Sequence, residues 1–310
     1  MAKIHDRVFF GDKITQLDRA QLSVASSAVL YGLSVYTVFP ITKNSQNNLL
    51  AFRIEDHFQR LIESARIIGI DDFEKNWNFS KFKNAVDELC EANKLDESVF
   101  VRATVHVNEL VPGTKSRGLK TILSIFLYEA TPILPAAGAR LKTSVWRRIP
   151  DYAIPSRAKV NGAYVNSVLA KQDAIDSGYD DCIFLDAQGH VCELSAANIF
   201  MVRNGELVTP DNTNDLLEGI TRRTVLQLAR DNGLTVRERS LDLTELYVAD
   251  EVFACGTSAN LTVITEIDAR KIGNGERPVT RNLQKLYKQV LNGGNDHYLA
   301  WTTSVSSPQK

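Results

Sequence analysis

The sequence predicts two mixed α/β domains, of the class also written α+β. Segments with the β-branched and aromatic content of strands are interspersed with segments whose apolar residues recur at helical spacing. The chain has 310 residues, beyond the size at which one core usually stops growing. The stretch TPILPAAGAR at residues 131–140 interrupts the pattern. We therefore expect a small N-terminal domain over residues 1–130, an interdomain loop over 131–142 and a large C-terminal domain over 143–310.

The first domain is expected to combine strands with two amphipathic helices. RVFFGDKI has the Gly-Asp turn of a hairpin, and further strands are expected at 31–41, 48–54, 98–107 and 120–130. Helices are expected at 55–70, where acidic residues stand at the start, and at 81–95.

The second domain is expected to pack helices against a mixed or antiparallel sheet. Helical patterns cover 164–178, 219–233 and 280–291, and the helix at 219–233 ends at Gly233. Strand–turn–strand patterns cover 181–194 and 198–210, the latter with Asn204-Gly205 at its turn. Residues 244–268 are read as a short helix that leads into strands.

Composition and charge narrow the classes of function. The net charge of −1 gives no electrostatic reason to expect nucleic acid or an anionic membrane as a partner. The first residues, MAKIHDRVFFGDKI, lack the long apolar segment expected of a signal peptide, and the sequence contains no run of about 20 apolar residues. The four cysteines form no C-x-x-C pair, so we expect buried free thiols and no metal site. These features favour a cytoplasmic protein.

Four segments place polar side chains where strands end or helices begin, which is where ligand sites are often built. Thr221 follows Gly219 at the start of a predicted helix, where free N–H groups attract anions. The Gly256-Thr257-Ser258 turn follows a strand, and its amides and hydroxyls suit a phosphate or a carboxylate. Each segment alone is more often an ordinary cap or turn.

The other two segments carry ionisable groups. Glu193 follows a strand and is able to accept a hydrogen bond from a protonated heterocycle. Lys159 precedes Tyr164 by five residues, and a lysine in an apolar pocket can form a Schiff base with an aldehyde. For either residue alone, solvent exposure is the commoner outcome.

Taken together, the segments resemble a known family. The stretches that carry the likeness are YGLSVYTVF, DHFQRLIESAR, KVNGAYVNSVLAKQDAIDSGYDDCIFLDAQGHVCELSAANIF, LVTPDNTNDLLEGITRRTVLQLA and ADEVFACGTSA. Their order and spacing resemble the class IV aminotransferases, which are fold-type IV pyridoxal-phosphate enzymes of the D-amino acid aminotransferase-like architecture. The branched-chain amino acid aminotransferases are the most similar group, and the likeness runs from about residue 7 to about residue 287.

The resemblance implies a role for each matching residue around pyridoxal 5'-phosphate. Lys159 is expected to be the catalytic residue that binds the cofactor aldehyde and moves the substrate proton. Tyr164 is expected to donate to the ring oxygen, and Glu193 to pair with the ring nitrogen. The remaining expected cofactor-binding residues, mostly for the phosphate, are Arg60, Leu217, Ile220, Thr221 and Thr257.

The same resemblance implies a substrate pocket, a homodimer or higher homo-oligomer, and amino acids and keto acids as small-molecule partners. The expected substrate-binding residues are Tyr31, Tyr36, Val38, Phe100, Arg102, Ser258 and Ala259. Arg102 is expected to receive a substrate carboxylate. Phe100 stands where branched-chain enzymes carry a tyrosine, so one hydrogen bond of roughly 0.5–1.5 kcal/mol is missing. Val38 stands where those enzymes carry glycine.

The implied activity is transfer of an amino group from L-leucine, L-isoleucine or L-valine to 2-oxoglutarate by a ping-pong mechanism. The alternative is an (R)-amine or D-amino acid transaminase of the same fold, or a mixed specificity, which Phe100, Val38 and Pro40 favour. A lyase such as aminodeoxychorismate lyase and a non-catalytic phosphate-binding module are two further alternatives.

Overall fold

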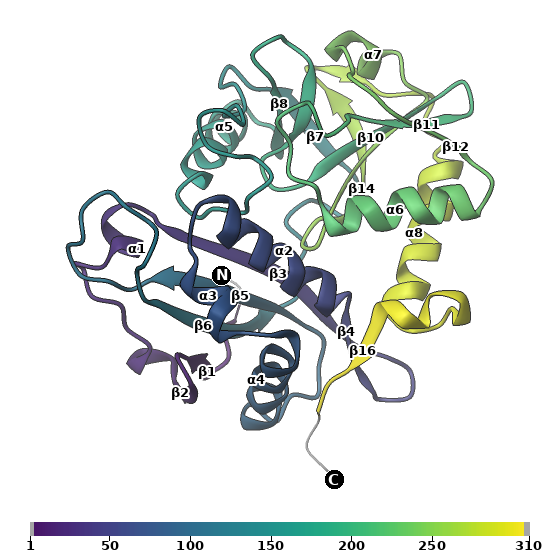
Figure 1. Cartoon of the computed structure of the whole chain (residues 1–310). Helices are drawn as coiled ribbons and strands as arrows, with labels where there is room; N and C mark the ends of the chain where they lie inside the picture. Colours follow the sequence, from purple (N-terminus) through teal and green to yellow (C-terminus); the bar gives the residue numbers. More distant parts are fainter. Residues whose placement is uncertain (1–2, 307–310) are drawn as a thin grey trace. The chain divides into compact units, whose positions relative to one another are not determined.

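The computed structural model describes residues 3–306, which divide into two compact units (Figure 1). Unit 1 contains the chain up to Thr131, the segment Ala158–Gly162, and the chain from Gln289 onward. Unit 2 contains Pro132–Arg157 and Ala163–Lys288. Each unit combines a sheet with helices, so the predicted mixed α/β fold is confirmed. No helix within residues 3–306 is long and apolar enough to cross a membrane.

Unit 1 is built on an antiparallel sheet of seven strands in the order β16-β4-β3-β5-β6-β1-β2. The strands are β1 (Arg7–Phe10), β2 (Lys13–Gln16), β3 (Ser34–Lys43), β4 (Leu49–Phe52), β5 (Val99–Val107), β6 (Thr121–Glu129) and β16 (Thr302–Ser304). The central strands β3 and β5 pair over eight residues, from Ser34 opposite His106 to Ile41 opposite Val99. This register determines which side chains of β3 and β5 share a face of the sheet.

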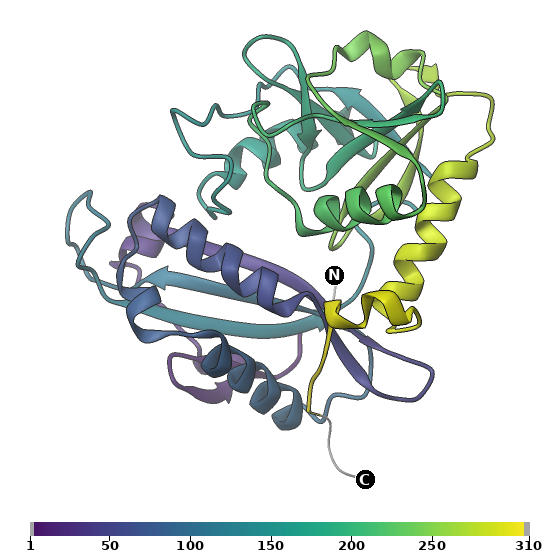
Figure 2. The ribbon, with the colours of Figure 1, turned by 45° about the vertical axis from the view of Figure 1, so that its right-hand side comes forward.

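Helices cover this sheet. The helical segments are η1 (Leu17–Arg19), α1 (Ser27–Leu30), α2 (Ile54–Ile67), α3 (Asp72–Asn76), α4 (Phe79–Ala92) and η2 (Asp296–Trp301). Helix α2 packs against β3, while α4 packs against β1, β2 and β6 (Figure 2). The side chain of Asn78 accepts the N–H of Lys81 at 2.9 Å, which caps the start of α4. Phe58 of α2 and Phe82 of α4 join the two helices, with ring centroids 5.0 Å apart.

Unit 2 is built on a mixed sheet of nine strands. They are β7 (Ala139–Thr143), β8 (Asp181–Leu185), β9 (Val191–Leu194), β10 (Asn198–Arg203), β11 (Glu206–Thr209), β12 (Thr235–Glu238), β13 (Glu251–Gly256), β14 (Asn260–Ile267) and β15 (Arg270–Lys271). Their order is β12-β11-β10-β13-β14-β7-β8-β9, with β15 beside β14. Because β9 also pairs with β10, the sheet closes on itself.

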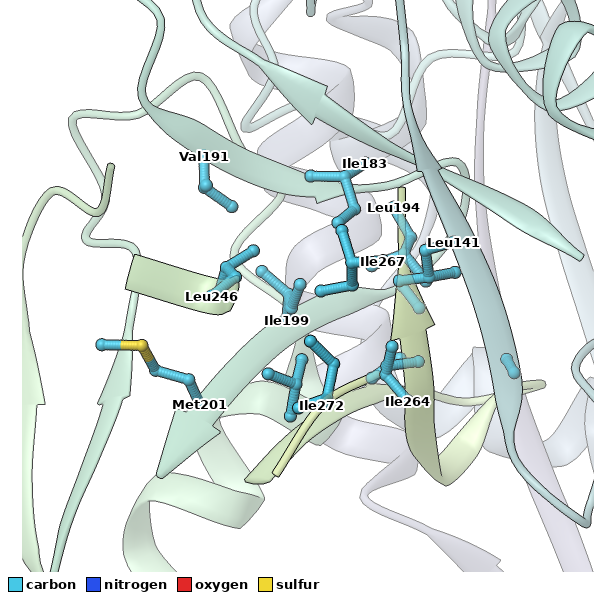
Figure 3. Packing of buried hydrophobic residues seen from close by; sticks show 14 of the residues in the cluster. Leu141, Ile183, Val191, Leu194, Ile199, Met201, Leu246, Ile264, Ile267 and Ile272 are labelled. Carbon is cyan, nitrogen blue, oxygen red and sulfur yellow. The ribbon is translucent and has the colours of Figure 1, made fainter. Parts of the chain in front are cut away.

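Apolar side chains fill the inside of this closed sheet. The helices of the unit are α5 (Tyr164–Asp176), α6 (Ile220–Asp231), α7 (Leu243–Tyr247) and most of α8 (Pro278–Leu291). Figure 3 shows Ile183, Ile199 and Ile264, which come from different strands, turned toward a common centre. All three are fully buried, and truncating such a residue to alanine typically costs about 2–5 kcal/mol.

The structure contains every strand and helix that the sequence pattern predicted, but it also contains elements that the pattern missed. Strand β7 occupies Ala139–Thr143, which overlaps the expected interdomain loop at 131–142. This five-residue strand is enclosed by β14 and β8, both parallel to it, so tertiary pairing rather than local pattern determines it. The short segments α1, α3, β12, β15 and β16 were also not predicted.

The division into units also differs from the expected boundaries, because two segments join unit 1 from later in the sequence. Residues Ala158–Gly162 join it because Lys159 O accepts the N–H of Tyr36 at 3.0 Å and Val160 forms a bridge with Val35. The C-terminal segment joins it because β16 pairs with β4, with Thr302 opposite Phe52. Both additions depend on pairings between residues far apart in sequence.

The four cysteines are free and buried, as expected. Burial raises the pKa of Cys90 and of Cys255 to about 12 and also raises the pKa of Cys182 and Cys192. Thiols with such pKa values hold very little of the nucleophilic thiolate at neutral pH. Their contribution is therefore to packing.

His106 gives the protein a predictable loss of stability in acid. It lies on β5 with Nε2 2.9 Å from Ser124 Oγ, and burial, followed by the charge of Arg102, lowers its pKa to about 4. In the unfolded chain the imidazole has a pKa near 6.5, so it binds a proton more readily there than in the folded protein. The folded state therefore has its full stability above about pH 6.5 and loses the contribution of neutral His106 as pH falls toward about 4. When pH is lowered from about 7 to about 5, the free energy of unfolding of His106→Gln should fall by roughly 1–2 kcal/mol less than that of the wild type. Urea unfolding at both pH values measures this, and parallel losses would contradict it.

Candidate active site

Lys159 lies in the segment Ala158–Gly162, whose backbone is held firmly within unit 1. Its N–H donates to Ser64 Oγ of α2 at 3.1 Å, and its carbonyl accepts the N–H of Tyr36 at 3.0 Å. Two residues on, the N–H of Asn161 donates to the carbonyl of Ser34 at 2.9 Å. The backbone of Lys159 is therefore fixed between β3 and α2.

The side chains of Lys159 and Arg102 meet at the ring of Tyr36. Lys159 Nζ lies 4.8 Å from the ring centroid and Arg102 Cζ lies 3.7 Å from it. The electron-rich face of an aromatic ring attracts cations at such distances. Arg102 Nη2 also donates to Asn161 Oδ1 at 2.7 Å, and Asn161 Nδ2 donates to Ser34 Oγ at 2.7 Å. Three residues predicted from the sequence thus lie together, and Asn161 links the arginine to the lysine segment.

Two more predicted residues share this face of the sheet. In the β3–β5 register Val38 lies opposite Arg102 and Pro40 lies opposite Phe100. Since alternate residues of a strand face the same side, Tyr36 and Val38 lie on one face together with Phe100 and Arg102. Val38 is 8% exposed and Phe100 is 3% exposed. Tyr31 lies apart from this group, at the end of α1, and is 47% exposed.

Arg60 lies on α2 and reaches the neighbouring position of β3. Its Nη2 donates to Thr37 Oγ1 at 3.2 Å, and Thr37 Oγ1 lies 2.8 Å from His57 Nδ1. Thr37 and His57 are both buried. This hydrogen-bonded chain fixes the direction of a guanidinium, a group whose planar fork suits a phosphate.

In unit 2, Glu193 of β9 is held by three donors. Arg148 Nη2 lies 3.0 Å from Oε1, while Asn198 Nδ2 and the N–H of Leu217 each donate to Oε2 at 3.2 Å. The side chains of Arg148 and Glu193 are only 12% and 8% exposed. A cation, an amide and a backbone N–H are donors that suit an ionised carboxylate. The predicted residues Glu193 and Leu217 are thus in direct contact.

The start of α6 lies beside this cluster. Gly219 precedes the helix, and a Cβ at this position would collide with the side-chain oxygen of Asn198. Since glycine has no capping side chain, the first amides of the twelve-residue α6 have no side-chain cap. Ile220 and Thr221 are the first two helical residues and are 4% and 5% exposed. This is a local structure in which a helix dipole and free amides attract an anion.

The turn between β13 and β14 carries Thr257, Ser258 and Ala259. A Cβ at Gly256 would lie 3.3 Å from the carbonyl oxygen of Ala196, so glycine permits close contact with the segment that follows β9. The carbonyl of Ser258 accepts the N–H of Ile133 at 3.0 Å, and Ala259 is fully buried. Tyr164, the remaining predicted residue of this unit, is the half-buried first residue of α5.

Comparison with known protein families shows which family the chain belongs to. The sequence profile of the family described as amino-transferase class IV matches residues 34–267, which is more than half of the chain. The chain belongs to the class IV aminotransferase family. It is therefore an enzyme, and the alternative of a non-catalytic phosphate-binding module is excluded.

The aminotransferase is similar along nearly its whole length to several named relatives. A probable branched-chain-amino-acid aminotransferase of Aquifex aeolicus is 37% identical over 304 residues, which cover 97% of each chain. The branched-chain aminotransferase of Thermoproteus uzoniensis, solved with norvaline, has a TM-score of 0.92 and 35% identity, covering 97% of this chain and 99% of that one. The branched-chain amino acid aminotransferase of Thermobaculum terrenum, solved in its PLP form, has a TM-score of 0.90 and 31% identity, and the match covers 98% of this chain and 99% of that one.

The structure of this aminotransferase also shows polar residues that the sequence reading missed. Arg148 and Asn198 hold Glu193, and Asn161 holds Arg102. Asn198 carries a signal in the sequence, because it is the one polar residue of the otherwise apolar run NIFMV. Arg148 carries none, since it lies in an irregular segment whose partner is distant in sequence.

Proposed function

We propose that this aminotransferase moves the amino group of L-leucine, L-isoleucine or L-valine to 2-oxoglutarate, with pyridoxal 5'-phosphate as its cofactor. The arrangement of Lys159 and Arg102 around Tyr36 carries the proposal, since it sets an amine beside a cation that suits a carboxylate, on the same face of the sheet as Val38 and Phe100. The names of the relatives favour the same substrate class.

The residues of this chain have the chemistry that the cofactor needs. An anionic partner for a protonated ring nitrogen is provided by Glu193, whose carboxylate is fixed by Arg148 and Asn198. Donors for a phosphate are provided by the uncapped start of α6 and by hydroxyl and guanidinium groups. The proposed cofactor-binding residues are Lys159, Tyr164, Glu193, Arg60, Leu217, Ile220, Thr221 and Thr257.

When bound, pyridoxal phosphate supplies an electron sink for charge that develops at the substrate Cα. In this proposal the Lys159 amine takes the proton from Cα, a step for which general base catalysis contributes roughly 10²–10⁴-fold. Glu193 accepts a hydrogen bond from the ring nitrogen and keeps its proton in place. Tyr164 donates to the ring oxygen. Leu217 contributes indirectly, because its N–H already donates to Glu193.

Substrate selection is assigned to the face that carries Arg102. Arg102 binds a carboxylate, while Tyr36, Val38 and Phe100 enclose an apolar side chain. Ser258 and Ala259 lie in the glycine-preceded turn after β13 and offer backbone amides. Tyr31 is assigned to the pocket of a second copy in a homodimer, a role for which its 47% exposure leaves it available.

The Arg102→Ala variant tests the substrate assignment. We expect it to weaken reaction with 2-oxoglutarate by roughly 10–100-fold, because a charged hydrogen bond contributes about 1.5–3 kcal/mol, and to affect (R)-1-phenylethylamine much less. Half-reactions with L-leucine, D-alanine and (R)-1-phenylethylamine, followed by the visible absorption of the cofactor, measure this. Arg66→Ala is the matched control, because Arg66 is 60% exposed. Equal losses for the acids and the amine would contradict the role of Arg102.

The same half-reactions separate the proposed substrate class from its alternative. Phe100 lacks a hydroxyl and Val38 fills space beside Arg102, which together favour some reaction with (R)-amines. Faster conversion of L-leucine than of D-alanine or the amine supports the branched-chain assignment. The reverse order would replace it with an (R)-amine or D-amino acid specificity.

A further inference from the structure

A hollow lies within unit 2, and none of the proposed active-site residues line it. Its volume is about 630 Å³, which is within the range of small-molecule sites. The walls come from β14, β15, the loop after β15 and the start of α8. The lining residues are Ala136, Ala137, Val263, Thr265, Glu266, Lys271, Ile272, Gly273, Asn274, Gly275, Arg277, Arg281 and Gln284. We call this hollow the α8 pocket.

The charged side chains of the α8 pocket are predominantly cationic. Lys271, Arg277 and Arg281 line it, and the described residues 3–306 offer none of these three an ion pair. The only carboxylate in the lining is Glu266, and its Oε1 pairs with Arg140 Nη2 at 2.8 Å. The pocket therefore has an excess of positive charge that the protein itself does not balance.

Arg277 is the most informative of these cations. It is only 6% exposed, and a buried charge is costly without an anionic partner. Nη1 donates to the carbonyl of Glu276 at 2.7 Å and Nη2 donates to the carbonyl of Ile272, which are neutral acceptors. Its Nε is buried and has no hydrogen-bond partner in the described part of the chain. Arg277 lines the hollow, and its Nη atoms meet only neutral carbonyls, so its positive charge lies at the wall of the hollow without an anionic partner in the described part of the chain.

The loop before α8 adds backbone donors. Gly273 and Gly275 have φ of +59° and +98°, and a Cβ at Gly273 would collide with the carbonyl of Asp250. Within residues 3–306 the amides of Gly273, Asn274 and Gly275 donate to no acceptor. Successive amides in a turn of this kind form an anion-binding concavity.

The helix start itself is not the anion site. Both carboxylate oxygens of Glu251 accept amides of α8, with Oε1 bound to the N–H of Val279 at 3.0 Å and Oε2 to that of Thr280 at 2.8 Å. A ligand in the α8 pocket must therefore bind through the glycine loop and the three cationic side chains. Val263 and Ala137 add apolar surface to the lining.

We propose that the α8 pocket binds a small organic oxyanion with two or more negative charges, separately from the aminotransferase substrates. The ligand forms charge-assisted hydrogen bonds with Arg277 and Arg281, and Lys271 adds a point charge. Two sources share this chemistry, namely polycarboxylates and phosphate esters. The test distinguishes them.

The experiment titrates the cofactor-loaded enzyme with citrate and with glycerol 3-phosphate in a calorimeter. We expect at least one probe to bind, and we expect Arg281→Gln to weaken that binding about tenfold or more, because a charge-assisted hydrogen bond is lost. Lys288→Gln is the matched control, since this exposed lysine lies about two turns further along α8 and outside the pocket lining. We expect it to change the dissociation constant by less than about twofold, as expected for a solvated charge.

Each outcome of the titration has a defined meaning. Binding of citrate alone identifies a polycarboxylate site, binding of glycerol 3-phosphate alone identifies a phosphate-ester site, and binding of both supports the shared oxyanion chemistry. If Arg281→Gln lowers the unfolding temperature, Lys271→Gln is used as the test variant instead. Lys271 is an exposed residue of the short strand β15, so its substitution should leave the fold intact. Absence of binding by both probes, or binding that neither substitution weakens, would overturn the proposal. Since no lining residue belongs to the proposed active site, failure here leaves the proposed function unaffected.

Discussion

The Lys159→Ala variant is expected to lose transamination almost completely, with kcat lower by at least about 10³-fold. Loss of general base catalysis alone accounts for roughly 10²–10⁴-fold. The fold should be retained, because the backbone of Lys159 rather than its side chain makes the hydrogen bonds to Ser64 and Tyr36. Single-turnover reaction with L-leucine measures the rate, and thermal unfolding checks the structure.

The covalent role of Lys159 has its own readout. Borohydride reduction of the wild-type holoenzyme should attach the cofactor permanently to the peptide that contains Lys159, and peptide mass mapping locates the label. Lys13→Ala is the control, because Lys13 is an exposed residue of unit 1 and should leave both the rate and the label unchanged. A label on another lysine would refute the assignment.

Local patterns in the sequence predict the regular elements of this fold well, because those elements bury one periodic face. Helix α2 buries Phe58, Leu61 and Ile62 at the expected spacing. The elements that were missed are short and owe their existence to distant partners. Strand β16 is three residues long and exists because β4 offers an edge for pairing. No local signal encodes such a pairing.

The candidate site shows the same limit. Lys159 and Glu193 are selected as candidates from the family resemblance, but the residues that contact them cannot be selected in that way. Arg148 meets Glu193 across 45 positions of sequence, and Asn161 meets Arg102 across 59. Such partners are brought together only when the sheets form. Candidate reactive residues can therefore be predicted from the sequence. The residues that hold those candidates in place are much harder to predict, because they come from distant parts of the chain.

The Glu193→Ala variant is expected to lose both stability and activity. Arg148 would remain buried without its carboxylate partner, and breaking such a pair typically costs about 3–5 kcal/mol. Activity should fall because the ring nitrogen would lose the anion that keeps it protonated. Urea unfolding measures the stability, and single-turnover kinetics with saturating cofactor measures the activity.

A second substitution separates these two losses. In the Arg148→Met/Glu193→Ala double variant no unpaired charge remains buried, so part of the stability lost in Glu193→Ala should return. Activity should not recover, because the ring nitrogen still lacks its partner. The exposed pair Arg66–Glu74 is the matched control, and its double variant should leave stability nearly unchanged, because exposed ion pairs contribute little. If activity returned together with stability, Glu193 would be a structural partner of Arg148 and not a cofactor-binding residue.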